Sequence, residues 1–185
     1  MVEVMRILKE EHENLTRLLD LLNGEIDALG KGGKPDYDLI NALLEYNLTF
    51  PDLCHHPKED VVLAKLKEIN PQAAAEVGDL EADHRDLAGL ARRFVESVRH
   101  VLAEEEVPRD EVMKRAREFS EFLHRHIDME ERVFFPAALG NLKAEDWDDV
   151  DRAVHTPPDP LFGSEVDTPF LELRAEIDRQ VGKST

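Results

Sequence analysis

Apolar side chains recur at steps of three and four residues along the first part of the chain. Between residues 2 and 29 they stand at Leu8, Leu15, Leu19, Leu22 and Ile26. Because an α-helix turns once in about 3.6 residues, this spacing places all of these side chains on one face. A cluster of glycines at 30, 32 and 33 then stops the pattern. The segment 2–29 is therefore predicted to be a long amphipathic helix.

The same spacing returns in three further segments, at residues 35–69, 71–104 and 109–140. Within the first of these, Pro51 and Pro57 predict a kink or a short break, because proline cannot donate a helical hydrogen bond. No segment alternates apolar and polar residues for long enough to predict a strand. Four long helices joined by short turns predict an all-α fold, an up-down-up-down antiparallel four-helix bundle.

Residues 141–185 differ in character from the rest of the chain. Prolines cluster in this segment, and only residues 170–181 show helical spacing. The segment still carries large apolar side chains, which a fully disordered tail rarely does; these are Trp147, Leu161, Phe162 and Phe170. We therefore expect a bundle domain over 1–140 and a proline-containing C-terminal extension over 141–185. The extension is expected to carry one short helix and to pack on the bundle or on a partner.

The charge balance limits the partners of this chain. It has 41 acidic and 23 basic residues, a formal net charge of −18. A phosphate backbone or an anionic bilayer would repel such a surface, so we expect neither nucleic acid nor membrane as a partner. No apolar run is long enough to cross a bilayer, and the N-terminus lacks a leader pattern. A cytoplasmic location is expected.

Two isolated histidines interrupt the apolar stripes of the first and third predicted helices. His12 lies between Leu8 and Leu15, and His84 lies between Leu80 and Leu87. A single histidine in a leucine stripe is usually a hydrogen-bonded core residue. Both of these histidines are nevertheless predicted to face the core.

The second and fourth predicted helices each carry a histidine and a glutamate four residues apart. The pairs are His55 with Glu59 and His126 with Glu130. Residues at i and i+4 share one helical face, and here that face continues through apolar residues such as Val62 and Val133. Both pairs are therefore predicted to point into the bundle.

These six residues are predicted to lie at one depth of the bundle. Counted from the expected helix ends, each histidine is roughly 15 to 21 Å along its helix at 1.5 Å per residue. Four imidazoles and two carboxylates buried together would be costly without a metal ion to coordinate them. The pattern therefore predicts a metal site, with six candidate ligands: His12, His55, Glu59, His84, His126 and Glu130.

Other pairs with similar spacing lead to different interpretations. His100 and Glu104 lie too far along their helix and are expected to form a surface ion pair. A ferritin-like di-iron site would use Glu-x-x-His pairs, which occur at 81–84 and 121–124, but not on the helices that such a site needs. His56 is rotated by about 100° from His55 in an α-helix. Because it pairs with Asp60 at i+4, His56 is a further candidate ligand beside the six.

The motif set resembles that of a known family. The order is an isolated histidine, then His-His-Pro-Lys-Glu-Asp at 55–60, a second isolated histidine, and His-x-x-x-Glu-Glu at 126–131. It is similar to the hemerythrin-like, or HHE cation-binding, domain over residues 1 to about 140. The resemblance implies a non-haem di-iron centre on the six candidate ligands. Oxygen-carrying hemerythrins add a fifth histidine where this chain has Ala88. In this respect the site is similar to those of iron-centre repair proteins of the same fold.

Imidazole and carboxylate ligands suit iron, manganese or zinc. The resemblance implies two iron ions, with Glu59 and Glu130 and an oxo or hydroxo group as bridges. Each metal would then keep one open position for a small ligand such as dioxygen, peroxide or nitric oxide. We therefore expect peroxide decomposition, nitric oxide handling or iron-centre repair. The alternatives are a reversible oxygen-binding or sensing module, a metal-storage protein without turnover, and a helical interaction protein without metal. Enzymatic turnover stays open.

Cys54 is the single cysteine of the chain, so no intrachain disulfide can form. It adjoins His55, where a thiol could react with nitric oxide or peroxide. The simpler interpretation is a small buried residue.

Overall fold

The computed structural model describes residues 2–181. Helices make up almost all of the regular structure, and no strand occurs within this range. The prediction of an all-α fold is confirmed. The α-helices are α1 (Glu3–Gly30), α2 (Tyr37–Phe50), α3 (His56–Ile69), α4 (Pro71–Val77), α5 (Leu80–Leu102), α6 (Arg109–Met129), α7 (Phe135–Asn141), α8 (Ala144–Ala153) and α9 (Leu171–Val181).

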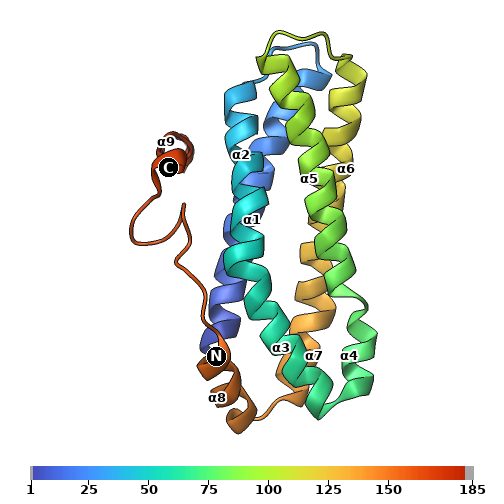
Figure 1. The fold of residues 1–185 in the computed structure, drawn as a ribbon, viewed down its shortest axis with the longest axis vertical. Coiled ribbons are helices and arrows are strands. Elements are labelled where there is room, and N and C mark those ends of the chain that lie inside the picture. The colour runs from blue at the N-terminus through green and yellow to red at the C-terminus, as the bar shows by residue number, and fades with distance from the viewer. Residues whose placement is uncertain (1, 182–185) are drawn as a thin grey trace.

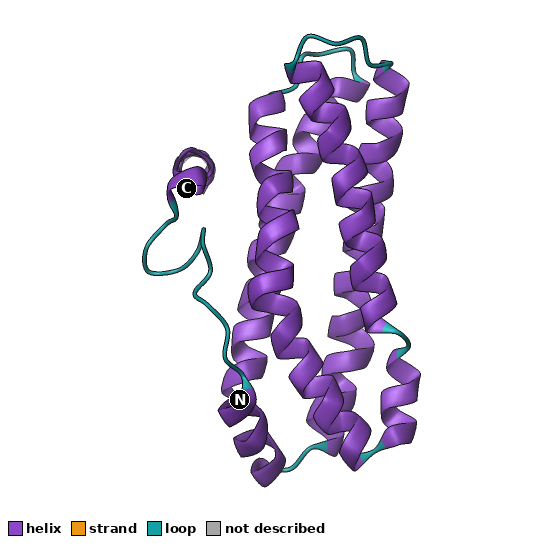
Figure 2. Cartoon of the chain, viewed as in Figure 1, coloured by secondary structure: helices purple, strands orange, loops and turns teal. Residues whose placement is uncertain are grey.

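Four long rods lie side by side (Figure 1). One rod is α1, one is α2 continued by α3, one is α5, and one is α6 continued by α7. Helix α5 packs against both α2 and α6, and α6 also packs against α1. The loops that join α1 to α2 and α5 to α6 lie at the same end of the rods (Figure 2). No helix within the described residues is both long enough and apolar enough to span a membrane.

Two rods contain a short π-helical segment. The sequence predicted a kink at the first of them and a regular helix at the second. They are η1 (Pro51–His55) and η2 (Glu130–Phe134). A π turn holds one extra residue and is often found at functional sites. The predicted break near Pro51 is thus a π turn, through which the rod continues. In η2 the extra residue turns Val133 outward, to 38% exposure, and Phe134 is buried in its place.

A glycine divides the helix that was predicted over 71–104. Gly78 adopts a φ of 87°, which L side chains rarely adopt, and it ends α4. The carboxylate of Asp79 then accepts a hydrogen bond from the Ala82 amide at 3.0 Å and caps α5. The long predicted helix is therefore two helices, α4 and α5.

The segment after α7 contains more helix than the sequence predicted. Residues 144–153 form α8, and a short 3₁₀ turn η3 (Thr168–Phe170) leads into α9. The expectation of one short helix in this segment was wrong, because α8 also forms there. Helix α8 packs on α1 and α3, whereas η3 and α9 pack on α2. Trp147, Leu161 and Phe170 are all buried.

The apolar core consists of two clusters along the rods. One contains Leu15 and Leu123 with residues of the extension such as Leu161, and the other contains Leu8 and Phe134. His12 follows Leu8 and precedes Leu15 in α1, so it belongs to a layer between the two clusters. The polar residues described next occupy this layer.

Candidate metal centre

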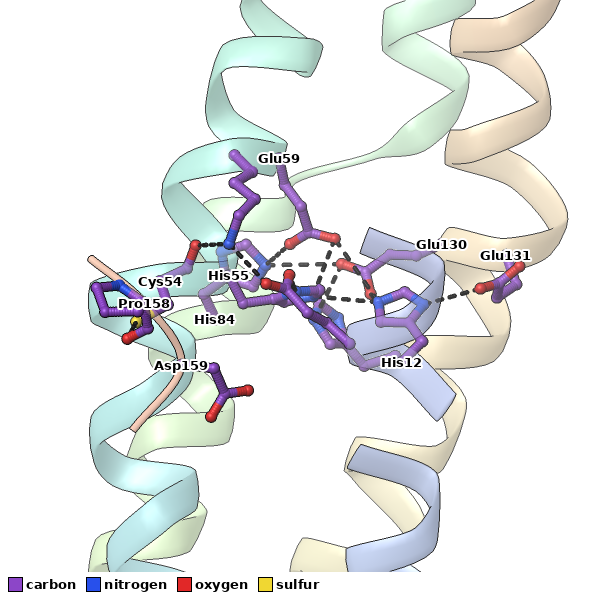
Figure 3. Close-up of polar contacts among 12 residues, drawn as sticks. His12, Cys54, His55, Glu59, His84, Glu130, Glu131, Pro158 and Asp159 are labelled. Atoms are coloured by element: carbon purple, nitrogen blue, oxygen red, sulfur yellow. Dashed lines mark hydrogen bonds and ion pairs between the residues drawn. The ribbon is translucent and has the colours of Figure 1, made fainter. Parts of the chain in front are cut away.

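All six residues singled out in the sequence meet in the layer between the two apolar clusters. Each of them is at most 8% exposed. They come from all four rods, and Figure 3 shows His12, His55 and His84 gathered around Glu59 and Glu130. The structure thus brings together His12, His55, Glu59, His84, His126 and Glu130.

The donor atoms form two groups. In the first, His12, His55, Glu59 and Glu130 each place one donor atom within 4.8 Å of the others. The Nε2 atoms of His12 and His55 are 3.1 Å apart. Both imidazoles therefore aim the same nitrogen at one point.

The second group includes His56, which the sequence analysis named only as a further candidate. Donor atoms of His56, His84 and His126 lie within 4.8 Å of one another. The rings of His56 and His84 are stacked, with centroids 3.6 Å apart. His56 follows the π turn η1 directly, and this turn lets His55 and His56 both face the centre. The expected partner of His56, Asp60, is exposed, and His56 Nδ1 contacts Asp52 Oδ1 at 3.2 Å instead.

The two carboxylates stand between the groups. One oxygen of Glu59 is 3.4 Å from His55 Nε2, and the other is 3.4 Å from His84 Nε2. One oxygen of Glu130 is 3.3 Å from His12 Nε2, and the other is 3.1 Å from His126 Nε2. Each carboxylate thus presents one oxygen to each group.

These contacts do not satisfy the polar atoms as hydrogen bonds. Both oxygens of Glu59, both oxygens of Glu130 and the Nε2 atoms of His84 and His126 are buried without a hydrogen-bond partner. Buried polar atoms are normally paired, and unpaired ones cost about 1 to 3 kcal/mol each or more. Nitrogen and oxygen atoms that converge in this way without hydrogen-bond partners are what a cation would satisfy. The residues therefore fit a bound metal ion.

Three of the histidines are also held from outside by carboxylates. His12 Nδ1 contacts Glu131 at 3.0 Å, and His55 Nδ1 contacts Glu11 at 2.9 Å. Donation from Nδ1 to an outer carboxylate leaves Nε2 as the inward lone pair, as is common around metal sites. With Asp52 at His56, these partners are candidate site residues that the sequence reasoning missed. Glu131 directly follows Glu130, and Glu11 directly precedes His12. Being next to a candidate ligand in the sequence was not enough to identify them.

A buried lysine completes the surroundings of His55. Lys58 is 5% exposed, and its Nζ donates to Glu11 Oε1 at 2.7 Å and to the Cys54 carbonyl. Glu11 is therefore shared between Lys58 and His55. The ammonium group of Lys58 is thus separated from His55 by the Glu11 carboxylate alone.

The environment shifts the pKa values of the histidines in opposite directions. Burial lowers the pKa of His55, but the surrounding carboxylates outweigh it and raise this pKa to about 10. In the same way the pKa of His84 is raised to about 9. Burial, together with neighbouring histidines, lowers the pKa of His56 to about 2, and burial lowers that of His126. A metal ion would replace the protons on His55 and His84.

The residues of the rival interpretations lie outside this layer. Glu81, Glu121 and His124 are exposed, which excludes the ferritin-like pairs. His100 is exposed too, and its nearest carboxylate is Glu105, at 3.8 Å, rather than the expected Glu104. Cys54 is 2% exposed, and burial raises the pKa of its thiol, as expected for a small buried residue.

The fold and the site define an all-helical protein with a buried histidine and glutamate centre of the kind that holds cations. The hemerythrin HHE cation binding domain matches residues 4–138 of this chain. The chain therefore belongs to the hemerythrin HHE family. Searches of curated proteins and of solved structures found no match.

Proposed function

We propose that this chain holds two iron ions in the buried layer and uses them to react with small oxidants such as peroxide, dioxygen or nitric oxide. One observation carries the proposal. Glu59 and Glu130 each turn one oxygen toward His12 or His55 and the other toward His84 or His126. Carboxylates placed in this way are suited to bridge two cations.

The donor atoms alone do not select the metal. Nitrogen and oxygen donors suit iron, manganese and zinc alike, and iron when bound supplies the redox chemistry. In this proposal one ion takes His12 and His55, the other takes His56, His84 and His126, and both take the two glutamates. The first ion then has fewer protein donors than the second. Small ligands are expected to bind at the first ion, which modifies the sequence-based expectation of one open position on each.

The surrounding residues limit what can reach the ions. Every candidate donor is at most 8% exposed, and apolar clusters lie on both sides of the layer. We therefore expect only small molecules to reach the ions. Glu11 and Glu131 fix the orientation of His55 and His12, so that the chain presents nearly preformed donors.

The test uses the full chain loaded with ferrous iron without oxygen. We expect absorption bands in the near ultraviolet after addition of peroxide, and repeated consumption of peroxide. Glu59→Ala should lose the bands and the consumption, whereas Asp60→Ala, a change at the exposed neighbouring residue, should keep both. A wild-type chain that binds iron but neither reacts with peroxide nor binds nitric oxide would overturn the proposal.

Reversible oxygen binding is a second candidate function. The observation that favours it is His56. Ala88 stands where oxygen carriers have their fifth histidine, but His56 brings a fifth imidazole to the candidate centre. Three histidines on one ion and two on the other give an unequal pair, with ligand access at one ion only. A carrier should release dioxygen under an inert gas and leave peroxide unconsumed, whereas the first candidate predicts the opposite.

A further inference from the structure

Tyr46 is a fully buried phenol whose hydroxyl is held by the C-terminal extension. Its exposed fraction is 0%, and its hydroxyl donates to Asp159 Oδ2 at 2.9 Å. Asp159 follows Pro158, whose carbonyl is 3.8 Å from the Cys54 sulfur. Figure 3 shows Asp159 and Pro158 beside the turn that carries His55.

The Asp159 carboxylate is held in a defined orientation. Its Oδ1 accepts the backbone N–H groups of Leu161 and Phe162 at 2.8 and 2.9 Å. The other oxygen, Oδ2, is thereby directed at the phenol. A buried hydroxyl could be satisfied by a backbone carbonyl, but here its partner is a group that can take up a proton.

Aromatic rings connect this phenol to the candidate metal centre. The rings of Tyr46 and Phe50 are stacked, with centroids 5.0 Å apart and planes at 8°. Phe50 in turn stacks on His55, with centroids 6.1 Å apart and planes at 30°. Tyr46 is thus separated from a candidate metal ligand by a single ring, without an aliphatic gap.

We propose that Tyr46 is an electron donor to the metal centre, with Asp159 as its proton acceptor. Oxidation of a phenol makes it a strong acid, so the electron can leave only when the proton has a base to go to. The structure provides both routes on one side chain, with Asp159 at the hydroxyl and Phe50 stacked on the ring. The proton passes to Asp159 Oδ2, and the electron passes through Phe50 to His55. Tyr46 would form a neutral tyrosyl radical.

The step balances with peroxide as the oxidant. Reduction of one peroxide to two waters takes two electrons and two protons. Tyr46 supplies one electron, the metal ions supply the other, and solvent supplies the protons that form water. The Tyr46 O–H bond breaks, and its proton moves to Asp159. Two equivalents of a one-electron reductant such as ascorbate or a thiol later return both electrons, one to the tyrosyl radical and one to the metal ions, and the proton goes back from Asp159 to the phenol.

This inference rests on the proposed function, so the experiment first measures bound iron and peroxide consumption. The iron-loaded full chain is then mixed with peroxide, frozen within milliseconds and examined by electron paramagnetic resonance. Tyrosine deuterated on the ring identifies a tyrosyl signal. The chain has only two tyrosines. Tyr46→Phe keeps the ring and its packing, and Tyr37→Phe is the matched control.

We expect a tyrosyl signal in the wild type that persists in Tyr37→Phe and disappears in Tyr46→Phe, with iron content unchanged. Asp159→Asn should lower the yield of the radical several-fold while circular dichroism still shows the folded chain. A hydrogen bond that only anchors the extension predicts no such signal. If iron binds and peroxide is consumed but the signal is absent or survives in Tyr46→Phe, the relay is overturned and the proposed function stands. Failure to bind iron overturns both.

Discussion

His55 and His56 are adjacent in the sequence, yet both face the candidate centre. In a regular α-helix they would diverge by about 100°. The π turn η1 ends at His55 and changes this relation, so that His55 joins one group of donors and His56 the other. The number of histidines that a metal ion could use here therefore depends on one local backbone feature.

Replacement of His56 should weaken one metal position and spare the other. His56→Ala removes a donor from the group with His84 and His126, so we expect the second metal ion to bind at least ten-fold more weakly, the lower end of what loss of supporting groups costs. His124→Ala, at an exposed histidine, should leave both ions bound. Metal titration with chelator competition measures the two affinities. Equal titrations of the two variants would remove His56 from the site.

The outer carboxylates should matter for affinity as well. Glu11→Gln keeps the size of the side chain but removes the charge that faces His55 and Lys58. We expect metal affinity to fall by about 10-fold to 100-fold. Glu13→Gln is the control, two residues along the same helix and exposed. If a chelator competition assay finds no difference between these variants, Glu11 does not support the site.

At this scale the sequence predicted which six residues the structure brings together. His12 and His84 could be placed because each interrupts a regular apolar stripe, and the two His-Glu pairs because their spacing matches one helical face. His56 could not be decided, because periodicity assumes 3.6 residues per turn and does not reveal a π turn. Glu11 and Glu131 were missed because outer partners have no spacing rule of their own.

Helix boundaries follow local chemistry that apolar spacing can conceal. The stripe of Val77 and Leu80 continues across Gly78, so it predicted one helix where there are two. The signal was nevertheless present, since glycine with a following aspartate ends one helix and caps the next. Similarly, Trp147, Val150 and Val154 have the spacing of α8, but acidic neighbours masked it.

Two glycines should respond in opposite ways to the same substitution. Gly78→Ala forces a β-carbon into a φ of 87°, and we expect a loss of about 1 to 3 kcal/mol in the free energy of unfolding. Gly24→Ala lies within α1 with nothing within 4 Å of the added carbon, so a gain of about 0.5 to 1 kcal/mol is expected. Urea unfolding of both variants checks the sign. Equal effects would contradict the assigned break between α4 and α5.

On the scale of the whole molecule, the extension contributes to the same core as the rods. Leu161, Phe170 and Leu173 belong to the apolar cluster that contains Leu15 and Leu123. Asp159 reaches the phenol of Tyr46 from the same segment. The extension therefore covers the side of α2 that leads to His55.

Truncation of one buried leucine in the extension tests this packing. Leu161 is 0% exposed, and Leu161→Ala should cost about 2 to 5 kcal/mol of unfolding free energy. Leu171→Ala, where the side chain is 53% exposed, should change it by less than about 0.5 kcal/mol. Thermal or denaturant unfolding provides the comparison. If Leu161→Ala is as mild as Leu171→Ala, the extension does not pack on the rods in solution.

The proposed two-metal centre is tested most directly by the metal content of the purified chain. The protein would be purified from iron-supplied cells, or reconstituted with ferrous iron, and analysed by elemental analysis together with protein quantification. Bridging by Glu59 and Glu130 predicts roughly two iron ions per chain, lost together in Glu59→Ala. A folded chain that holds no metal, or a single ion that Glu59→Ala leaves in place, would contradict it.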